Sequence, residues 1–364
     1  MAGYSGGKNV TIIDVAERAG VSRATASRAL SNYGRIAQDT VDRVKQAAEE
    51  LGYRPNQIAR SMRQGSTKTI GLVIIADFTN AFFDRVTKGI VDTARSLGYQ
   101  VLISNTDEHL EVERDAVQTL IEKQVDGLIV VPTSPVVFDH LTPKALNSKP
   151  LVLIDRMVEG LKVTSITTDD FVGAEEAIRN AVSLGHDRFG FLIATETVSG
   201  RTYERPAALI STVAERANGF MSGAVDAGIK PKQMHWIYLN DDPHVAELAV
   251  VELLDRPKPP SVIFTSNNDM ALAALKVIGN RGLQLGRDIS LVTVDDSLWL
   301  EAFRPGITVV ERPVEQLAQT AVKKLIEEIE SPGQKPEKIV MPTRLLARGS
   351  VANLKLRPEL RSNE

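Results

Sequence analysis

The sequence of 364 residues contains no cysteine. The chain can therefore form no disulfide and no thiolate metal site, and it has no cysteine nucleophile. It also lacks an apolar run long enough to span a membrane, and its start, MAGYSGGKNV, lacks the hydrophobic stretch of a secretion signal. These absences fit the reducing cytoplasm, and we expect a cytoplasmic protein that has no contact with a membrane.

The motifs of common catalytic sites are missing as well. Neither GxSxG nor HExxH occurs, and the five histidines are scattered without a pair at metal-ligand spacing. His186, in SLGHDRFGF, has the position of a structural residue that follows a helix. The segment GYSGGKN resembles a phosphate-binding loop but lacks its first glycine, and Asn9 replaces the Ser or Thr that holds magnesium. We therefore predict no enzyme, no cofactor and no metal site.

Charge is divided unevenly along the chain, although the net charge is only −3. Residues 1–64 hold ten Lys or Arg against six Asp or Glu, whereas the remainder holds 33 against 40. A basic segment on an acidic body is typical of a phosphate-contacting module joined to a separate sensor. The hydrophobic content of 43% supplies cores for the two or three domains that this length predicts.

Residues 10–64 contain the pattern of a helix-turn-helix. Thr11, with an aspartate three positions later, forms a variant capping box that predicts the start of the first helix. Gly20 allows the sharp turn before the second helix, which begins at Ser22. A third helix is expected from about residue 39 to 51. Such a unit presents its second helix to the DNA major groove, so the sequence predicts a sequence-specific DNA-binding regulator.

The second helix carries side chains that suit DNA. Arg23 and Arg28 present forks that match guanine O6 and N7, and Ala24 lies in the same exposed stretch. Small hydroxyl residues of this segment suit phosphate oxygens. We therefore expect both base edges and phosphates to be contacted from this helix.

Two motifs, DVAERAGVSRATASRAL and LGYRPNQIARSMR, resemble the LacI/GalR family of bacterial transcription regulators, and the resemblance extends over essentially the full length. It implies a homodimer whose two headpieces read a near-palindromic operator in double-stranded DNA. It also implies a hinge helix, from Asn56 to about Arg63, in the minor groove. Met62 stands where the family usually has the leucine that wedges the central base step. The alternative is that Met62 packs against the second hinge of the dimer without entering DNA.

The predicted DNA contacts thus lie in the first and second helices, in the segments that flank them, and in the hinge. Both the residue chemistry and the family resemblance support this set. It consists of Thr11, Ser22, Arg23, Ala24, Thr25, Ser27, Arg28, Arg35, Thr40, Tyr53, Asn56, Ala59 and Met62.

From Lys68 onward, apolar strand runs alternate with amphipathic helices, which predicts parallel sheets covered by helices. Two blocks of such units, about 68–168 and 169–295, predict two similar subdomains around a cleft. The resemblance implies three crossovers, with the helix near 313–330 in the first subdomain and the strands at about 337–348 in the second. The expected fold class is α/β: a helix-turn-helix headpiece and a hinge helix, then a two-subdomain, periplasmic-binding-protein-like core with parallel sheets.

The sequence also predicts domain boundaries. The tail contains Pro358 and no heptad repeat, so we expect a dimer without a tetramerising coiled coil. The predicted segments are a headpiece at 9–54, a hinge helix and linker at 55–67, an effector-binding and dimerisation core at 68–348 and a tail at 349–364. Within the core, the first subdomain takes about 68–168 and 297–330, and the second takes about 169–296 and 331–348.

Polar residues follow the predicted strands, where ligands bind in open parallel sheets. Carboxylates accept hydrogen bonds from adjacent hydroxyls. The arginine guanidinium donates hydrogen bonds to ring and hydroxyl oxygens, and phenylalanine covers the apolar face of a sugar. The motifs NAFF, DR, ERxxGF and NND also resemble periplasmic ribose-binding proteins. By that match, the expected effector contacts are Asn80, Phe82, Phe83, Asp155, Arg156, Arg216, Asn268 and Asp295.

Each of these residues also has a purely structural interpretation. Asp155 and Arg156 form an ion pair in that interpretation, Asn268 caps a helix, and the two phenylalanines belong to the core. Two departures from the family pattern bear on the site. Residues 195–213 form a longer connection than usual, which reshapes the mouth of the cleft. Glu311 and Arg312 precede Pro313 where a neutral glutamine is common, which adds a charge contact to the effector.

The leading hypothesis is a repressor of sugar or polyol metabolism genes, controlled by a ribose-like pentose or an inositol-like polyol. A purine- or nucleoside-responsive repressor of the same fold is an alternative, although recognition of a diol explains the Asp155–Arg156 pair better. A cytoplasmic solute-binding or sugar-converting protein with a helical N-terminus is a further alternative. The missing signal peptide and the missing catalytic motifs argue against these last two.

Overall fold

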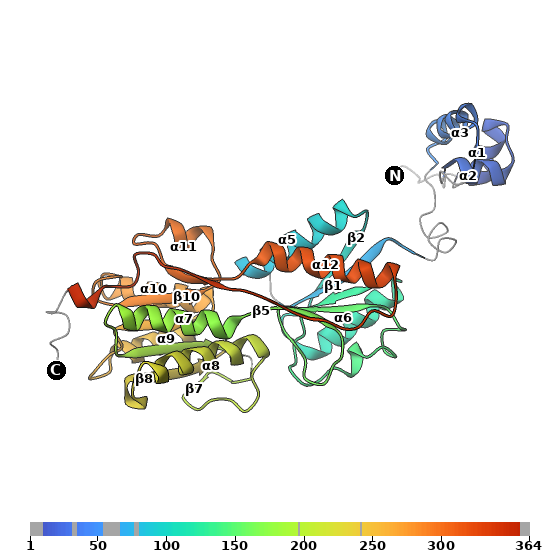
Figure 1. Cartoon of the computed structure of the whole chain (residues 1–364). Coiled ribbons are helices and arrows are strands. Elements are labelled where there is room, and N and C mark those ends of the chain that lie inside the picture. The colour runs from blue at the N-terminus through green and yellow to red at the C-terminus, as the bar shows by residue number, and fades with distance from the viewer. Residues whose placement is uncertain are drawn as a thin grey trace, which may run out of the picture. The chain divides into compact units, whose positions relative to one another are not determined.

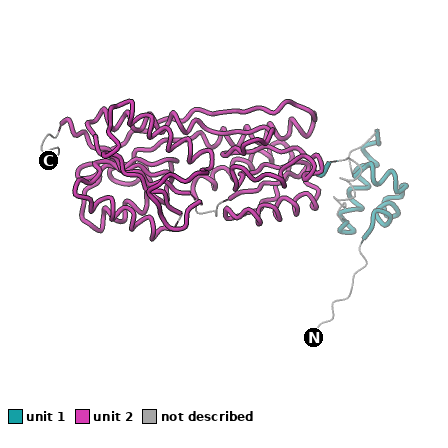
Figure 2. The backbone as a smooth tube through the Cα atoms, turned by 90° about the horizontal axis from the view of Figure 1, so that it is seen from below, with its two compact units in different colours: residues 1–67 teal, residues 68–364 magenta. Residues whose placement is uncertain are grey.

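The computed structural model describes residues 10–30, 35–53, 66–75, 80–195, 197–240 and 242–356. Backbone contacts divide the chain into two compact units, residues 1–67 and 68–364 (Figure 2). The predicted hinge contacts Asn56, Ala59 and Met62 lie outside the described residues, as does the end of the tail. Among the helices of the described ranges, none is both long and apolar enough to cross a membrane.

The headpiece, residues 10–53, is built from three helices: α1 (Ile12–Ala19), α2 (Arg23–Leu30) and α3 (Gln38–Glu50). The predicted capping box is confirmed, because the Thr11 hydroxyl accepts from the Asp14 amide while the Asp14 carboxylate accepts from the Thr11 amide. Gly20 ends α1 in the left-handed conformation, with φ of 64°. The turn between α1 and α2 therefore depends on local sequence signals.

Small side chains fill the headpiece core. Val15 and Val44 are fully buried, and six alanines of α1, α2 and α3 complete the cluster. Arg18 of α1 and Glu50 of α3 form an exposed ion pair across the bundle, with Nη2 and Oε2 2.7 Å apart. Because alanines allow close approach, the three short helices pack tightly, and the more polar face of α2 stays at the surface.

The first lobe of the core is built on a six-stranded sheet with all strands parallel. Its strand order is β12-β5-β4-β3-β1-β2. One face is covered by α5 and α12, which lie side by side (Figure 1), and α6 packs on a second apolar cluster of the lobe. The elements are β1 (Thr69–Ile74), α5 (Ala81–Ser96), β2 (Gln100–Asn105), α6 (Leu110–Glu122), β3 (Leu128–Val130), η1 (Asp139–Leu141), β4 (Leu151–Ile154), β5 (Thr164–Thr168), α12 (Val314–Glu330) and β12 (Lys338–Met341).

The second lobe is built on a seven-stranded sheet with the order β13-β11-β10-β9-β6-β8-β7. Only its edge strands β7 and β13 are antiparallel to their neighbours. Helices α7 and α8 pack with one apolar cluster, and α9 and α10 with another. The elements are α7 (Asp170–Ser183), β6 (Phe189–Ala194), β7 (Arg201–Thr202), α8 (Ser211–Asp226), η2 (Pro231–Gln233), β8 (Met234–Leu239), α9 (Pro243–Leu254), β9 (Val262–Thr265), α10 (Asn268–Asn280), β10 (Ser290–Val294), α11 (Leu298–Ala302), β11 (Thr308–Glu311), β13 (Arg344–Leu346) and η3 (Leu354–Leu356).

The chain crosses between the lobes three times: between β5 and α7, between β11 and α12, and between β12 and β13. The helix α12 packs on the first sheet, as expected. Two strands differ from the predicted boundaries, because β11 pairs with β10 of the second sheet and β12 pairs with β5 of the first. The reason is that an apolar run by itself does not specify the sheet it joins, whether its partner is near in the sequence, as for β11, or distant, as for β12.

His186 follows α7 and is buried, in agreement with the structural role expected from the sequence. Its Nδ1 lies 2.9 Å from the Ser261 hydroxyl, and its Nε2 lies 3.0 Å from the Ala352 carbonyl oxygen. Burial lowers the pKa of His186 from 6.5 to about 4, although the Ala352 carbonyl acts in the opposite direction. The folded protein therefore holds this imidazole neutral at neutral pH.

Acidification below pH 6.5 is expected to destabilise the core through His186. Between pH 6.5 and about 4 the unfolded chain binds a proton that the folded chain does not bind. The stability contributed by neutral His186 is therefore complete above pH 6.5 and falls by about 3 kcal/mol as the pH approaches 4. Urea unfolding of wild type and of His186→Gln across this range measures the difference. Identical pH profiles of the two proteins would contradict the assignment.

Candidate functional site

The predicted DNA contacts in the headpiece lie mainly on its surface. Arg23, Ala24 and Arg28 of α2 are exposed, and α2 contains no acidic residue. The Ser22 hydroxyl accepts from the Thr25 amide at 3.1 Å, so this serine also starts the helix. The other described members of the set are exposed or half-buried: Thr11, Thr25, Ser27, Arg35, Thr40 and Tyr53. The surface thus offers cations and hydroxyls without competing carboxylates on α2.

In the core, two aspartates occupy equivalent positions in the two lobes. Asp155 follows β4 of the first sheet, and Asp295 follows β10 of the second. Both are left-handed, with φ of 70° and 71°, a conformation that aspartate adopts more readily than most residues. The Asp155 amide donates to the Ile166 carbonyl, and the Asp295 amide donates to the Val310 carbonyl. The same strand-end turn therefore presents a carboxylate from each lobe.

Arg312 bridges these two aspartates. It follows β11 and is 3% exposed. Its Nε and Nη2 donate to the two carboxylate oxygens of Asp295 at 2.6 and 2.8 Å, and its Nη1 donates to Asp155 at 2.5 Å. The guanidinium carbon lies 3.5 Å from the centre of the Phe82 ring. One side chain thus joins both lobes at the carboxyl ends of their strands.

Charges around Arg312 fix its protonation. Burial lowers the pKa of Arg312, but Asp295, Asp155 and Asp170 outweigh burial and hold this pKa above its usual range. Burial raises the pKa of Asp170, but Arg216 and Arg312 outweigh burial and hold it below its usual range. Asp170 and Arg312 are therefore each held in their charged form by the opposite charges around them.

Arg216 of α8 lies in the same cluster. Its Nε donates to Asp170 at 2.6 Å, and its Nη1 donates to the Ser266 carbonyl at 2.8 Å. Asp170, at the start of α7, also accepts from the Thr168 hydroxyl. Sequence reasoning missed Asp170 as a partner, since only the packing of α7 against α8 brings it to Arg216.

The predicted Asp155–Arg156 pair is a weak contact, with Nε and Oδ2 3.7 Å apart. Arg156 instead donates through Nη2 to Glu108 at 2.5 Å and through Nη1 to the Pro132 carbonyl at 3.4 Å. Glu108 precedes α6, far from Arg156 in the sequence. No local signal in the sequence indicated this pairing.

Four other predicted effector contacts have structural roles. The Asn80 side chain accepts from the Phe82 and Phe83 amides and caps α5, and both rings are buried in the first core cluster. The Asn268 amide, oriented with its nitrogen toward the strand end, donates to the carbonyl oxygens of Val294 and Asp295 at 3.2 and 2.9 Å. These residues support the polar cluster, and Phe82 contacts it directly.

Residues 195–213 add the edge strand β7, which pairs with β8. The end of this connection contacts the first lobe, because the Ser211 hydroxyl accepts from the Met157 amide at 3.0 Å. Met157 directly follows Arg156, so the long connection reaches the neighbourhood of the polar cluster.

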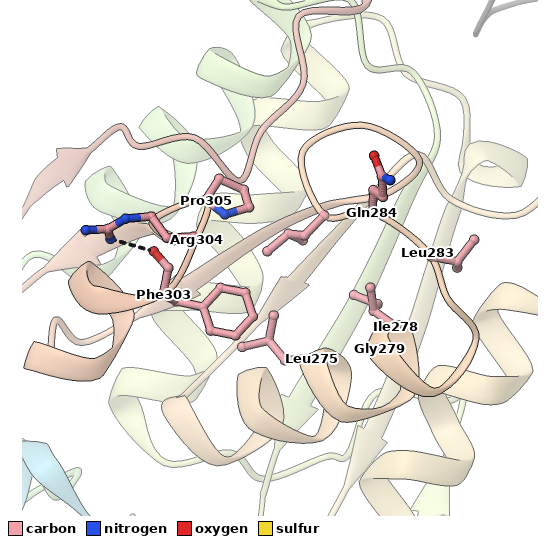
Figure 3. A pocket seen from close by; sticks show the side chains of 9 residues that line it. Leu275, Ile278, Gly279, Leu283, Gln284, Phe303, Arg304 and Pro305 are labelled. Atoms are coloured by element: carbon pink, nitrogen blue, oxygen red, sulfur yellow. Dashed lines mark hydrogen bonds between the residues drawn. The ribbon is translucent and has the colours of Figure 1, made fainter.

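A separate pocket of about 370 Å³ lies in the second lobe (Figure 3). Leu275, Ile278 and Gly279 of α10 form one side, and the 303–305 segment lies opposite. Arg304 donates to the Phe303 carbonyl at 2.9 Å. None of the eight predicted effector contacts lines this pocket.

Comparison with known proteins gives a consistent result. Residues 11–56 match the family described as bacterial regulatory proteins, lacI family, and residues 178–351 match a periplasmic binding protein-like domain. The HTH-type transcriptional repressor PurR of Photobacterium profundum is 31% identical over 346 residues, which cover 94% of this chain and 99% of that protein. The chain belongs to the LacI family of bacterial regulatory proteins.

Solved structures support the fold of this LacI-family regulator. The lac repressor dimer bound to operator and the anti-inducer ONPF has a TM-score of 0.80 at 24% identity, covering 95% of this chain and 100% of that chain. A LacI family regulator from Enterococcus faecium with bound ribose has a TM-score of 0.68 at 24% identity, covering 79% and 99%. The curated relative confirms the predicted family, and the family models and the solved structures confirm the predicted fold class.

Proposed function

We propose that this LacI-family regulator is a transcription repressor and not an enzyme. It acts as a homodimer whose exposed α2 residues, Arg23 and Arg28 among them, contact a near-palindromic operator. A small sugar or polyol that binds between the lobes of the core controls its affinity for the operator. The Asp155–Arg312–Asp295 cluster carries this proposal, because it links the two lobes where ligands of parallel sheets bind.

The chemistry of the cluster favours a polyhydroxylated ligand. Carboxylates accept from paired hydroxyls, and guanidinium groups donate to hydroxyl and ring oxygens. The ribose bound to a regulator of the same fold supports this class. A ribose-like pentose and an inositol-like polyol are therefore the first ligands to test.

Control of DNA binding follows from coupling between the two sites. The effector shifts the relative arrangement of the lobes only to the extent that it binds one arrangement more tightly. The interface of the dimer then transmits this shift to the headpieces. We assign this transmission to the predicted hinge, residues 55–67.

Replacing Arg216 by alanine is expected to weaken effector binding about 10- to 100-fold, the cost of losing charged hydrogen bonds. Operator affinity without effector is expected to stay unchanged, because the Arg216 partners Asp170 and Ser266 both lie in the second lobe and the contact between the lobes through Arg312 is kept. Calorimetry with the effector and fluorescence anisotropy with operator DNA measure the two affinities. Arg179→Ala is the control, since Arg179 is exposed and its ion pair with Glu175 lies within α7, away from the cluster partners of Arg216. A response of Arg216→Ala at wild-type effector concentrations would refute this role of Arg216.

A thermal-shift screen of the purified protein tests the effector class. The panel contains pentoses, hexoses, inositol, nucleosides and purine bases. A ligand at a hundred times its Kd adds about 2.7 kcal/mol of stability. Stabilisation by a sugar or polyol supports the proposal. Stabilisation by a purine base or a nucleoside alone contradicts the sugar assignment and identifies the alternative effector class.

A further inference from the structure

Arg312 makes the contacts that the sequence assigned to the effector. It hydrogen-bonds the carboxylates of Asp155 and Asp295, and its guanidinium lies over the Phe82 ring. These three residues were expected to bind hydroxyls and the apolar face of a sugar. The side chain of Arg312 therefore already binds three residues that the sequence assigned to the effector.

The position of Arg312 in the fold suits such a role. It lies at the crossover from β11 of the second lobe to α12 of the first. Its two aspartate partners come from different lobes, so the guanidinium connects the two lobes. By comparison, Arg216 pairs with Asp170 and Ser266, which both belong to the second lobe.

The balance of buried charge limits what can replace Arg312. The cluster and its direct partners contain four acids, Asp155, Asp170, Asp295 and Glu108, and three arginines, Arg156, Arg216 and Arg312, so acids are in excess by one. Removal of the Arg312 guanidinium leaves Asp295 without its arginine partner and Asp155 with only the weak contact to Arg156. A neutral ligand does not compensate these charges, and an anionic ligand adds another. Breaking a buried pair in this way is strongly unfavourable.

The neighbouring Arg156 compensates Asp155 only weakly, with Nε and Oδ2 3.7 Å apart. Arg156 is engaged by Glu108, with Nη2 and Oε1 2.5 Å apart. Glu215, half-buried on α8, is a further acid beside Asp170, and burial together with Asp170 raises its pKa, although Lys338 and Arg216 act in the opposite direction. The excess of acids over arginines in the cluster therefore favours a cation beside Asp155 and Asp295.

We propose that Arg312 is a built-in occupant of the effector site and that the effector displaces it by bringing its own positive charge. The ligand class is a polyhydroxylated ammonium compound, such as an amino sugar. This inference rests on the proposed function, because it concerns the ligand of the same site. While Arg312 stays in place, the fraction of protein that can bind is small, and a neutral sugar binds weakly.

Chemical rescue tests the occupancy without any sugar. The variant Arg312→Ala leaves a gap of guanidinium shape between the aspartates. Millimolar methylguanidinium is expected to raise the Tm of this variant, whereas urea, a neutral planar analogue, does not. Wild type and Arg281→Ala, which breaks only the exposed pair with Asp255, show no rise. Absence of rescue, or equal rescue by urea, would overturn the occupancy.

A matched set of sugars tests the charge of the effector. D-Glucosamine, D-glucose and D-glucuronate share one ring and carry positive, zero and negative charge. In wild type and in Arg312→Lys, glucosamine is expected to bind about a hundredfold more tightly than glucose, as the cost of an uncompensated buried charge implies. Arg312→Gln restores the neutral residue common at this position and is expected to bind glucose more tightly than wild type does.

The outcomes separate this inference from the proposed function. Equal wild-type affinity for glucosamine and glucose, unchanged in Arg312→Gln, overturns the inference and leaves the sugar-responsive repressor intact. If no sugar binds any variant while methylguanidinium still stabilises Arg312→Ala, the occupancy is supported and the sugar assignment fails. If Arg312→Ala does not fold, the comparison of Arg312→Lys with Arg312→Gln decides.

Discussion

Raising the salt concentration from about 50 to about 200 mM is expected to weaken operator binding by about 10³-fold or more. Each headpiece carries exposed cations, including Arg23 and Arg28, and α2 has no acid. We expect the two headpieces of a dimer to make about six to ten phosphate contacts, each of which releases counterions from the DNA. Because added salt opposes this release, the affinity falls steeply.

Fluorescence anisotropy with labelled operator DNA measures this dependence as the slope of log K against log salt. The same titration with non-specific DNA is the control, and its slope separates the phosphate contribution from base recognition. Arg23→Gln is expected to weaken binding at every salt concentration. A slope near zero for operator DNA would contradict a phosphate-contacting headpiece.

Replacement of Arg312 by methionine is expected to lower the free energy of unfolding of the core by about 3–5 kcal/mol. Methionine has a similar length but removes the arginine partner of buried Asp295 and leaves buried Asp155 with only the weak contact to Arg156. The contact with the Phe82 ring is retained only as an apolar contact. Urea unfolding followed by tryptophan fluorescence measures the change, since both tryptophans of the chain, Trp236 and Trp299, lie in the core.

An exposed ion pair provides the matched control. Arg281→Met removes the partner of Asp255, but these side chains are 31% and 60% exposed, so the expected loss is less than about 1 kcal/mol. Adding Asp155→Asn and Asp295→Asn to Arg312→Met is expected to recover most of the lost stability, because no uncompensated charge remains. Equal losses in Arg312→Met and Arg281→Met would show that the cluster contributes no more than a surface pair.

The headpiece was predictable because its signals are local. The capping box of Thr11 and Asp14 spans three positions, and the left-handed Gly20 ends the same eight-residue helix. The burial of Val15 follows from its spacing in a short amphipathic helix. In these helices and turns the interacting residues are close in the sequence, so the sequence pattern predicts the structure directly.

The core was predictable in class but not in connectivity. Apolar runs that alternate with helices indicate parallel sheets. Such a run does not specify which of the two sheets it joins. The strand β11 lies beside β10, whereas β12 lies beside β5, more than 160 positions away in the sequence. Competition among many possible strand pairs is decided by packing of the whole lobe, which a single segment does not reveal.

For the proposed site, the sequence by itself placed polar residues at strand ends, because parallel sheets present these ends to ligands. It singled out Asp155, Asp295 and the unusual Arg312. Only the tertiary structure decided that Arg312 binds both aspartates, since Asp155 lies 157 positions before it and in the other lobe. The physical reason is that pairing of buried charges depends on three-dimensional distance and on the exclusion of water, and only the folded chain determines both.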